Sequence, residues 1–177
     1  ERLTRKFIDF IHEIIGPEKD IPAPDVNTNA QVMAWIMDEY SKIHGYNPAV
    51  VTGKPLGLHG SEGREEATGR GVVFITADVL NSLSKSFENS TFIVQGFGNV
   101  GSYTAKYLAE YGGKVIGVSD VSGALYDPKG FNIPELMAYV KNNKTLKDYG
   151  QGKKISNEEL LTMPCDVLIP AALGGVI

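Results

Sequence analysis

The chain has 177 residues, of which 42% are apolar and 21% charged, and its 17 basic and 21 acidic side chains leave a net charge of −4. This balance argues against a nucleic-acid partner, because affinity for a phosphate backbone depends on many lysine and arginine contacts. No apolar run approaches the roughly 20 residues of a transmembrane helix, so we expect no membrane partner either.

The first third of the chain predicts two helices and a short strand. Apolar residues recur at helical spacing over residues 1–15, and a proline-rich loop over residues 20–25 keeps the backbone extended. A second helix is expected from Asn29 to His44, ended by Gly45, and a strand over residues 49–52. The apolar stripe expected on the first helix consists of Leu3, Phe7, Ile11, Ile14 and Ile15.

A polar stretch rich in glycine and proline follows, and we place a domain boundary there, near residue 60. Beyond it we expect helices and strands to alternate. The strands are expected over residues 91–95, 114–119 and 166–169. The helices between them are marked by Val72, Ile75, Val79, Leu80 and Leu83, by Val100, Thr104, Tyr107, Leu108 and Tyr111, by Pro134 to Lys141, and by a capping box that starts at Ser156. Such alternation predicts an α/β fold with a doubly wound parallel sheet, of which about the first half is present.

The motif Gly96-Phe97-Gly98-Asn99-Val100-Gly101 lies between the strand at 91–95 and the helix that follows. In this context a G-x-G-x-x-G motif is typical of dinucleotide binding. The first glycine permits a tight turn, the second lets the backbone approach a pyrophosphate, and the third lets helix and strand pack closely. The N-terminus of the helix supplies free N–H groups to the phosphates.

Asp120 ends the second strand of this unit, where a carboxylate can accept hydrogen bonds from the ribose hydroxyls of an adenosine. This position favours NAD as the cofactor. A 2′-phosphate would face like charge, although a nearby lysine or arginine could offset it, so NADP stays possible. The competing interpretation is that Asp120 caps the turn at Ser122-Gly123.

Cys165 is the only cysteine, so the chain cannot form an internal disulfide and fits a reducing compartment. We expect a cytoplasmic location, with the mitochondrial matrix as the alternative. His12, His44 and His59 show no ligand spacing with one another or with Cys165, and we expect no metal site. Because the chain starts within a predicted helix and lacks an initiator methionine, we expect it to be a piece of a longer protein.

Four segments in this order resemble glutamate dehydrogenase, within the Glu/Leu/Phe/Val dehydrogenase superfamily. They are residues 22–29 (PAPDVNTN), 51–55 (VTGKP), 63–71 (GREEATGRG) and 95–101 (QGFGNVG). The resemblance extends to residues 170–175 (PAALGG) and so covers essentially the whole chain. It implies that residues 1–60 are the C-terminal part of a substrate-binding domain and residues 61–177 the first half of an NAD(P)-binding Rossmann domain.

The resemblance also implies a reaction: the reversible oxidative deamination of L-glutamate to 2-oxoglutarate and ammonia, with hydride transfer to the nicotinamide. Asp25 matches the catalytic aspartate of the family, a group suited to moving protons on and off the amine and the attacking water. Arg64, Thr68 and Asn99 match positions that face the cofactor, and the four-residue spacing of Arg64 and Thr68 is expected to put both on one helix face. Ala171 and Ala172 are expected to approach the nicotinamide.

Two other functions remain open. One is a leucine, valine or phenylalanine dehydrogenase of the same superfamily, and the other is a nonenzymatic paralogue that binds nucleotide. The catalytic lysine of the family would lie upstream of Glu1, so we expect these 177 residues alone to be inactive. Family resemblance further suggests a homo-hexamer that acts on a small-molecule substrate.

Overall fold

The computed structural model describes residues 1–177 and divides them into two compact units, Glu1–Arg64 and Glu65–Ile177. The division lies four residues beyond the boundary expected near residue 60. Each unit has a hydrophobic core of its own.

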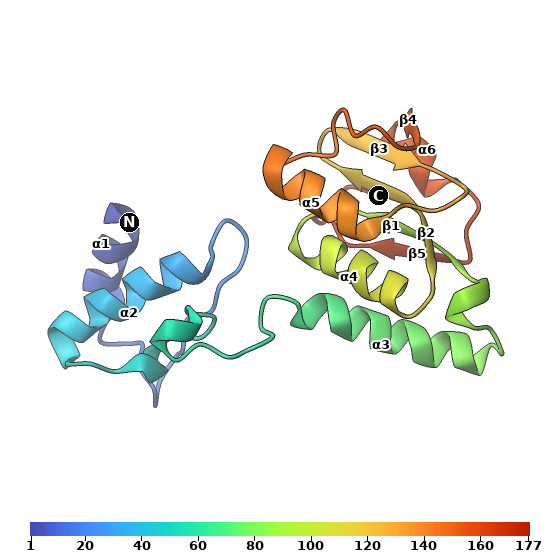
Figure 1. Ribbon diagram of the computed structural model, residues 1–177. Coiled ribbons are helices and arrows are strands. Elements are labelled where there is room, and N and C mark those ends of the chain that lie inside the picture. The colour runs from blue at the N-terminus through green and yellow to red at the C-terminus, as the bar shows by residue number, and fades with distance from the viewer. The chain divides into compact units, whose positions relative to one another are not determined.

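The first unit is a helical pair with two short 3₁₀ turns. Helix α1 (Arg2–Ile11) packs against α2 (Ala30–His44), as Figure 1 shows at the blue end of the chain. Asn29 caps α2 by accepting a hydrogen bond from the N–H of Val32, and Gly45 ends it at φ +80°. The 3₁₀ turns are η1 (Pro48–Val50) and η2 (Leu56–Leu58). The core residues of this unit are Ile8, Ile15, Met33, Ile36, Met37, Tyr40, Val50 and Val51.

Two sequence predictions in this unit are wrong. The expected strand at 49–52 is instead η1, because Asn47 caps a tight turn through the N–H of Ala49 and Pro48 takes its first position. The first helix ends at Ile11, and its expected stripe is mostly exposed. The helix has apolar residues on more than one side. The side that packs against α2 carries Ile8, which is fully buried, whereas Leu3, Phe7 and Ile14 are exposed.

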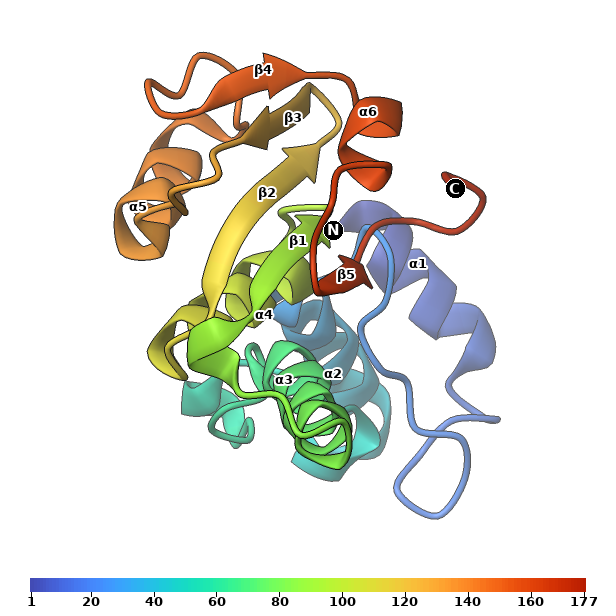
Figure 2. The same ribbon diagram turned by 90° about the vertical axis from the view of Figure 1, so that its right-hand side faces the viewer.

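The second unit contains a five-stranded sheet in the order β4-β3-β2-β1-β5 (Figure 2). Its strands are β1 (Thr91–Gln95), β2 (Lys114–Asp120), β3 (Gly123–Tyr126), β4 (Lys153–Ile155) and β5 (Val167–Pro170). Strand β1 pairs in parallel with both β2 and β5, as expected. The strands β3 and β4 were not predicted, and both pair antiparallel. Only two residues separate β2 from β3, which is too short for the crossover that a parallel neighbour requires.

Helices cover both faces of this sheet. Helices α4 (Asn99–Glu110) and α5 (Ile133–Asn143) contribute to one core with Phe92 and Val94, and α6 (Asn157–Leu161) buries Leu160 against Ile93 on the other side (Figure 2). A short 3₁₀ turn, η3 (Phe87–Asn89), leads into β1. Ser156 and Glu159 form the capping box of α6 that the sequence predicts. None of the helices combines the length and apolar character needed to cross a bilayer.

Helix α3 (Ala67–Ser82) packs against α4, and only part of its expected apolar stripe is buried. Leu80 is buried and Val72 is half-buried against the core, as expected. The other three residues of the stripe, Ile75, Val79 and Leu83, are exposed, and Val73 and Gly69 are buried instead. Gly69 explains the choice of face: a Cβ there would lie 2.7 Å from the backbone nitrogen of Thr104 in α4. The absence of a side chain lets the two helices approach closely, and the face of α3 that carries Gly69 therefore turns inward.

Candidate functional site

Three parallel strands end at one edge of the sheet in the second unit, and most of the expected site residues lie there. Strand β1 ends at Gln95, β2 at Asp120 and β5 at Pro170. In open α/β sheets, ligands bind outside the carboxyl ends of the strands. A cofactor site is therefore expected at the carboxyl ends of these three strands.

The turn after β1 contains two glycines, and any other residue at either position would displace neighbouring backbone atoms. Gly96 has φ +89°, and a Cβ there would lie 2.6 Å from the carbonyl oxygen of Ala171. A Cβ at Gly101 would overlap the carbonyl oxygen of Gly96. The side chain of Ser119 on β2 accepts a hydrogen bond from the N–H of Gly96 at 3.2 Å and so supports the turn. The roles predicted for Gly96 and Gly101 from the motif match this geometry.

Gly98 differs from these two glycines because nothing lies within 4 Å of a Cβ built on it. It is the N-cap residue of α4 and is exposed, and no side chain caps the helix at this end. The first-turn N–H groups of a helix have no partner within the helix and attract anions. A pyrophosphate can approach the backbone at Gly98, where no atom blocks it, and can accept hydrogen bonds from the uncapped amides of α4. These residues therefore fit a dinucleotide.

The other motif residues fill different roles. The side chain of Phe97 is only 5% exposed and packs in the core, so only its backbone is available to a ligand. Asn99 is exposed in the first turn of α4, and Val100 beside it is half-buried. Ala171 donates its N–H to the carbonyl of Gln95 at 2.8 Å, which places the chain after β5 beside the glycine turn. Ala172 follows and is exposed.

Asp120 is half-buried at the end of β2, and its carboxylate accepts four hydrogen bonds. Oδ1 accepts from the N–H of Ser122 at 2.7 Å and from its hydroxyl at 2.5 Å. Oδ2 accepts from the N–H of Leu146 at 2.6 Å and from the hydroxyl of Thr145 at 3.1 Å. Asp120 therefore does cap the turn at Ser122, and it also holds the loop between α5 and β4.

The environment of Asp120 favours the ionised carboxylate. Burial raises the pKa of Asp120, but hydrogen bonds from Ser122, Leu146 and Thr145 together bring the pKa below its ordinary value. The contact to Ser122 is the one predicted from the sequence as the competing role of Asp120, because an aspartate two residues before a serine is typical of a turn. The contact to Thr145 spans 25 residues, and no local pattern indicates it.

The expected pairing of Arg64 and Thr68 on one helix face is wrong. Helix α3 begins at Ala67, so Arg64 lies in the turn before it and only Thr68 is in the first helical turn. Both side chains are exposed.

Asp25 lies in the first unit, in the proline-rich loop. Its backbone N–H donates to the hydroxyl of Thr28 at 2.6 Å, and its carbonyl accepts from that same hydroxyl at 2.7 Å. The loop is fixed from the other side, because the carbonyl of Pro22 accepts from the N–H of Thr52 and Pro24 packs against Gly53. The backbone of Asp25 is therefore held while its side chain stays exposed and makes no hydrogen bond within the chain.

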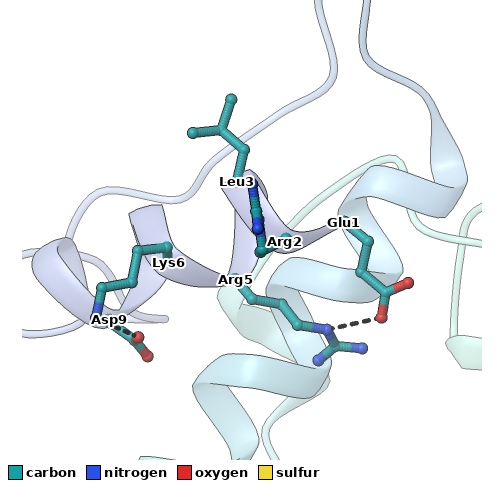
Figure 3. A pocket seen from close by; sticks show the side chains of 6 residues that line it. All are labelled: Glu1, Arg2, Leu3, Arg5, Lys6 and Asp9. Carbon is teal, nitrogen blue, oxygen red and sulfur yellow. Dashed lines mark hydrogen bonds and ion pairs between the residues drawn. The ribbon is translucent and has the colours of Figure 1, made fainter.

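Two further features lie in the first unit. His12 and His44, which show no ligand spacing in the sequence, are hydrogen-bonded through Nδ1 and Nε2 at 3.0 Å. No group of three potential metal ligands occurs in the chain. Figure 3 shows the side chains of Glu1 and α1 that line a hollow, with the ion pair between Arg5 and Glu1. Arg5 also contacts Asp38 and Glu39 of α2. The pKa of Arg5 is raised by these hydrogen bonds. Such an internally paired arginine stabilises the helix pair.

In the second unit, Cys165 is half-buried, and burial raises the pKa of its thiol. A thiol with a raised pKa is a poor nucleophile at neutral pH. The residue packs with Ile93 and Leu160.

The fold and the glycine turn together define the second unit as an α/β domain of the Rossmann type. Comparison with known proteins then narrows the class. The model of the Glutamate/Leucine/Phenylalanine/Valine dehydrogenase family matches residues 59–177, and the model of the Glu/Leu/Phe/Val dehydrogenase dimerisation domain matches residues 1–42. The chain belongs to this dehydrogenase family.

Individual relatives agree with this assignment. A glutamate dehydrogenase of Thermotoga maritima is 51% identical over 179 residues, which cover 100% of this chain and 43% of that protein. The hetero-hexameric glutamate dehydrogenase of Thermus thermophilus, in a leucine-bound form, superposes with a TM-score of 0.92 at 33% identity. That match covers 99% of this chain and 42% of the other. The Plasmodium falciparum enzyme superposes with a TM-score of 0.87 at 31% identity, over 96% and 38% of the two chains. The chain thus spans less than half the length of these relatives.

Proposed function

We propose that the protein to which this chain belongs is a glutamate dehydrogenase that oxidises L-glutamate to 2-oxoglutarate and ammonia with a nicotinamide coenzyme. The observation that carries the proposal is the 51% identity to the Thermotoga maritima enzyme across the whole chain. The open N-terminus of α4 behind Gly98 supports it, because that geometry suits the pyrophosphate of NAD or NADP.

Residues of the second unit would hold the coenzyme. The amides that begin α4 would bind the pyrophosphate, and Asp120 would accept hydrogen bonds from the adenosine ribose. Thr68, Asn99, Ala171 and Ala172 are the further candidates for contacts to the coenzyme, with Thr68 and the two alanines toward the nicotinamide. When bound, a nicotinamide ring accepts the hydride that leaves the substrate α-carbon. NAD is the preferred coenzyme in this proposal, since Asp120 is ionised and would repel a 2′-phosphate.

Asp25 would act on protons. Loss of hydride from the α-carbon converts the amine into an iminium, and water must then add to that carbon before ammonia can leave. A carboxylate that takes a proton from the attacking water and returns it to the departing nitrogen serves both steps. The exposed side chain of Asp25, on a loop whose backbone is fixed by Thr28 and Thr52, is suited to this role.

The remaining assignments follow from the same family membership. Residues 1–60 would belong to the substrate domain and residues 61–177 to the coenzyme domain. The assembly would be a homo-hexamer in the cytoplasm, and the exposed apolar residues Leu3, Phe7 and Phe10 of α1 would lie in a subunit interface. The match of residues 1–42 to a dimerisation domain supports the interface.

The proposal can be tested with the full-length protein and a pair of aspartate variants. We expect glutamate to be oxidised in preference to leucine, valine and phenylalanine, with NAD favoured over NADP. Asp25→Asn should lower kcat by about 100-fold or more, the usual effect of losing a general acid–base group. Asp20→Asn is the matched control, because Asp20 lies in the same loop and uses only its backbone carbonyl, which accepts from Gly16.

Faster turnover of leucine or phenylalanine than of glutamate would assign the protein to another branch of the family. Coenzyme binding without turnover of any amino acid would favour a nonenzymatic nucleotide-binding protein. If Asp25→Asn and Asp20→Asn have equal activity, Asp25 has no catalytic role.

A further inference from the structure

Donors within the chain face all the acceptor positions of the Asp120 carboxylate. A carboxylate offers about four lone-pair sites, and those of Asp120 face the N–H groups of Ser122 and Leu146 and the hydroxyls of Ser122 and Thr145. The single hydroxyl hydrogen of Thr145 is shared between Oδ2 of Asp120 at 3.1 Å and Oγ of Ser122 at 2.8 Å. A ribose that donates its 2′- and 3′-hydroxyls to Asp120 would need two of these sites. Some present donors must therefore leave when a coenzyme binds.

The two backbone donors cannot leave without moving the chain. The N–H of Ser122 belongs to the two-residue connection between β2 and β3, and the N–H of Leu146 belongs to a residue that is 2% exposed in the core. The two hydroxyls can leave, because each turns about a single bond. The exchangeable donors on Asp120 are therefore Ser122 and Thr145.

These two hydroxyls also contact each other. The Oγ1 of Thr145 lies 2.8 Å from the Oγ of Ser122, which in turn lies 2.5 Å from Oδ1 of Asp120. A hydroxyl both donates and accepts, so this pair can donate to a carboxylate, exchange bonds with a ribose hydroxyl or donate to a phosphate oxygen. Ser122 and Thr145 thus present, beside one fixed negative charge, two donors that suit either form of the coenzyme.

We propose that Ser122 and Thr145 are specificity-determining residues for the coenzyme, and that their hydroxyls weaken the preference for NAD over NADP. They compete with the ribose diol for Asp120, which costs affinity for NAD. They also offer hydrogen bonds to a 2′-phosphate, which partly offsets its repulsion by Asp120. The inference rests on the proposed function, because it assumes that the adenosine ribose lies at Asp120.

The test removes both hydroxyls from the full-length protein with the double variant Ser122→Ala/Thr145→Val. The readout is the NAD to NADP ratio of kcat/KM, together with the ratio of the dissociation constants of NADH and NADPH from fluorescence titration. A ratio within one variant does not depend on the fraction of active protein. We expect it to shift toward NAD by about tenfold, the effect of one hydrogen bond to a charged group.

Thr145→Ser is the conservative control, since it retains the hydroxyl, and its ratio should stay within about twofold of the parent protein. The single variants Thr145→Val and Ser122→Ala should each shift the ratio in the same direction, and they replace the double variant if it fails to fold. An unchanged ratio, or a shift toward NADP, in variants that bind a reduced coenzyme would overturn the inference alone. If the parent protein binds neither NADH nor NADPH, the proposed function itself fails.

Discussion

The glycines of the turn after β1 are required for two different reasons. Gly96 and Gly101 are surrounded by backbone atoms, whereas Gly98 has open space in front of it. A side chain at the first two positions would disturb the protein itself. A side chain at Gly98 would disturb only a ligand that occupies the space. The separate roles that the motif assigns to the three glycines predict this difference.

This difference predicts opposite phenotypes for two alanine variants. Gly101→Ala should lower the free energy of unfolding by about 2 kcal/mol or more, because the new Cβ overlaps the carbonyl of Gly96 and the backbone must shift. Gly98→Ala should leave stability within about 0.5 kcal/mol and yet weaken NADH binding by about tenfold or more. Urea denaturation and fluorescence titration measure the two quantities. Unimpaired NADH binding by Gly98→Ala would show that no phosphate approaches this backbone.

At the scale of elements, the contact between α3 and α4 depends on one buried glycine. We predict that Gly69→Ala destabilises the protein by about 1 to 3 kcal/mol, because its Cβ would press on the backbone of Thr104 and on Tyr103. Gly71→Ala, two residues along the same helix, meets nothing within 4 Å. It should be stabilising by up to about 1 kcal/mol through helix propensity. Urea midpoints that are equal for the two variants would contradict the close approach of α3 and α4.

Asp166 joins three elements at the opposite end of β1 from the glycine turn. Its carboxylate accepts from the ammonium of Lys85, after α3, at 2.7 Å, and from the N–H and hydroxyl of Thr91 at 2.9 and 2.8 Å. We predict that Asp166→Asn lowers the free energy of unfolding by about 1 kcal/mol. Lys85→Met should cost less, because the lysine is half-exposed and both bonds to Thr91 remain. A greater loss in Lys85→Met than in Asp166→Asn, measured by urea denaturation, would refute this ranking.

For the whole molecule, the shifted carboxylates predict how stability depends on pH. Lys85 and Thr91 hold the pKa of Asp166 well below its ordinary value, and the pKa values of Asp120, Asp127 and Glu66 are also lowered. A carboxylate with a lowered pKa in the folded state stabilises it above the unfolded pKa of about 4, and this contribution is lost as the pH falls. The melting temperature should therefore hold near pH 5 to 7 and fall steadily below about pH 4.

The variant Asp166→Asn provides the internal control for this prediction. It lacks the group with the largest shift, so its melting temperature should fall less between pH 5 and pH 3 than that of the parent protein. Parallel pH profiles for the two proteins would mean that Asp166 does not contribute to acid sensitivity.

Across the chain, local patterns were reliable where a few neighbouring residues decide the structure. The strand at 91–95, the cap at Asn29, the stop at Gly45 and the capping box at Ser156 all depend on residues within about four positions of one another. Apolar periodicity was unreliable where a packing partner elsewhere in the chain decides which face of a helix is buried. The apolar residues of α1 and α3 fit more than one buried face, and periodicity alone cannot say which face a neighbouring helix covers.

The same distinction applies to the candidate site. The sequence by itself determined the glycine turn, the strand before it, the helix after it and the aspartate at the next strand end, because steric limits on the backbone act locally. Only the tertiary structure decided that β3 and β4 extend the sheet antiparallel, that Gly69 rather than Ile75 faces α4, and that Thr145 and Leu146 fill the acceptor sites of Asp120. Except for the pairing of β2 with β3, those contacts join residues far apart in the chain, and their free energy depends on which surfaces meet when the chain is compact.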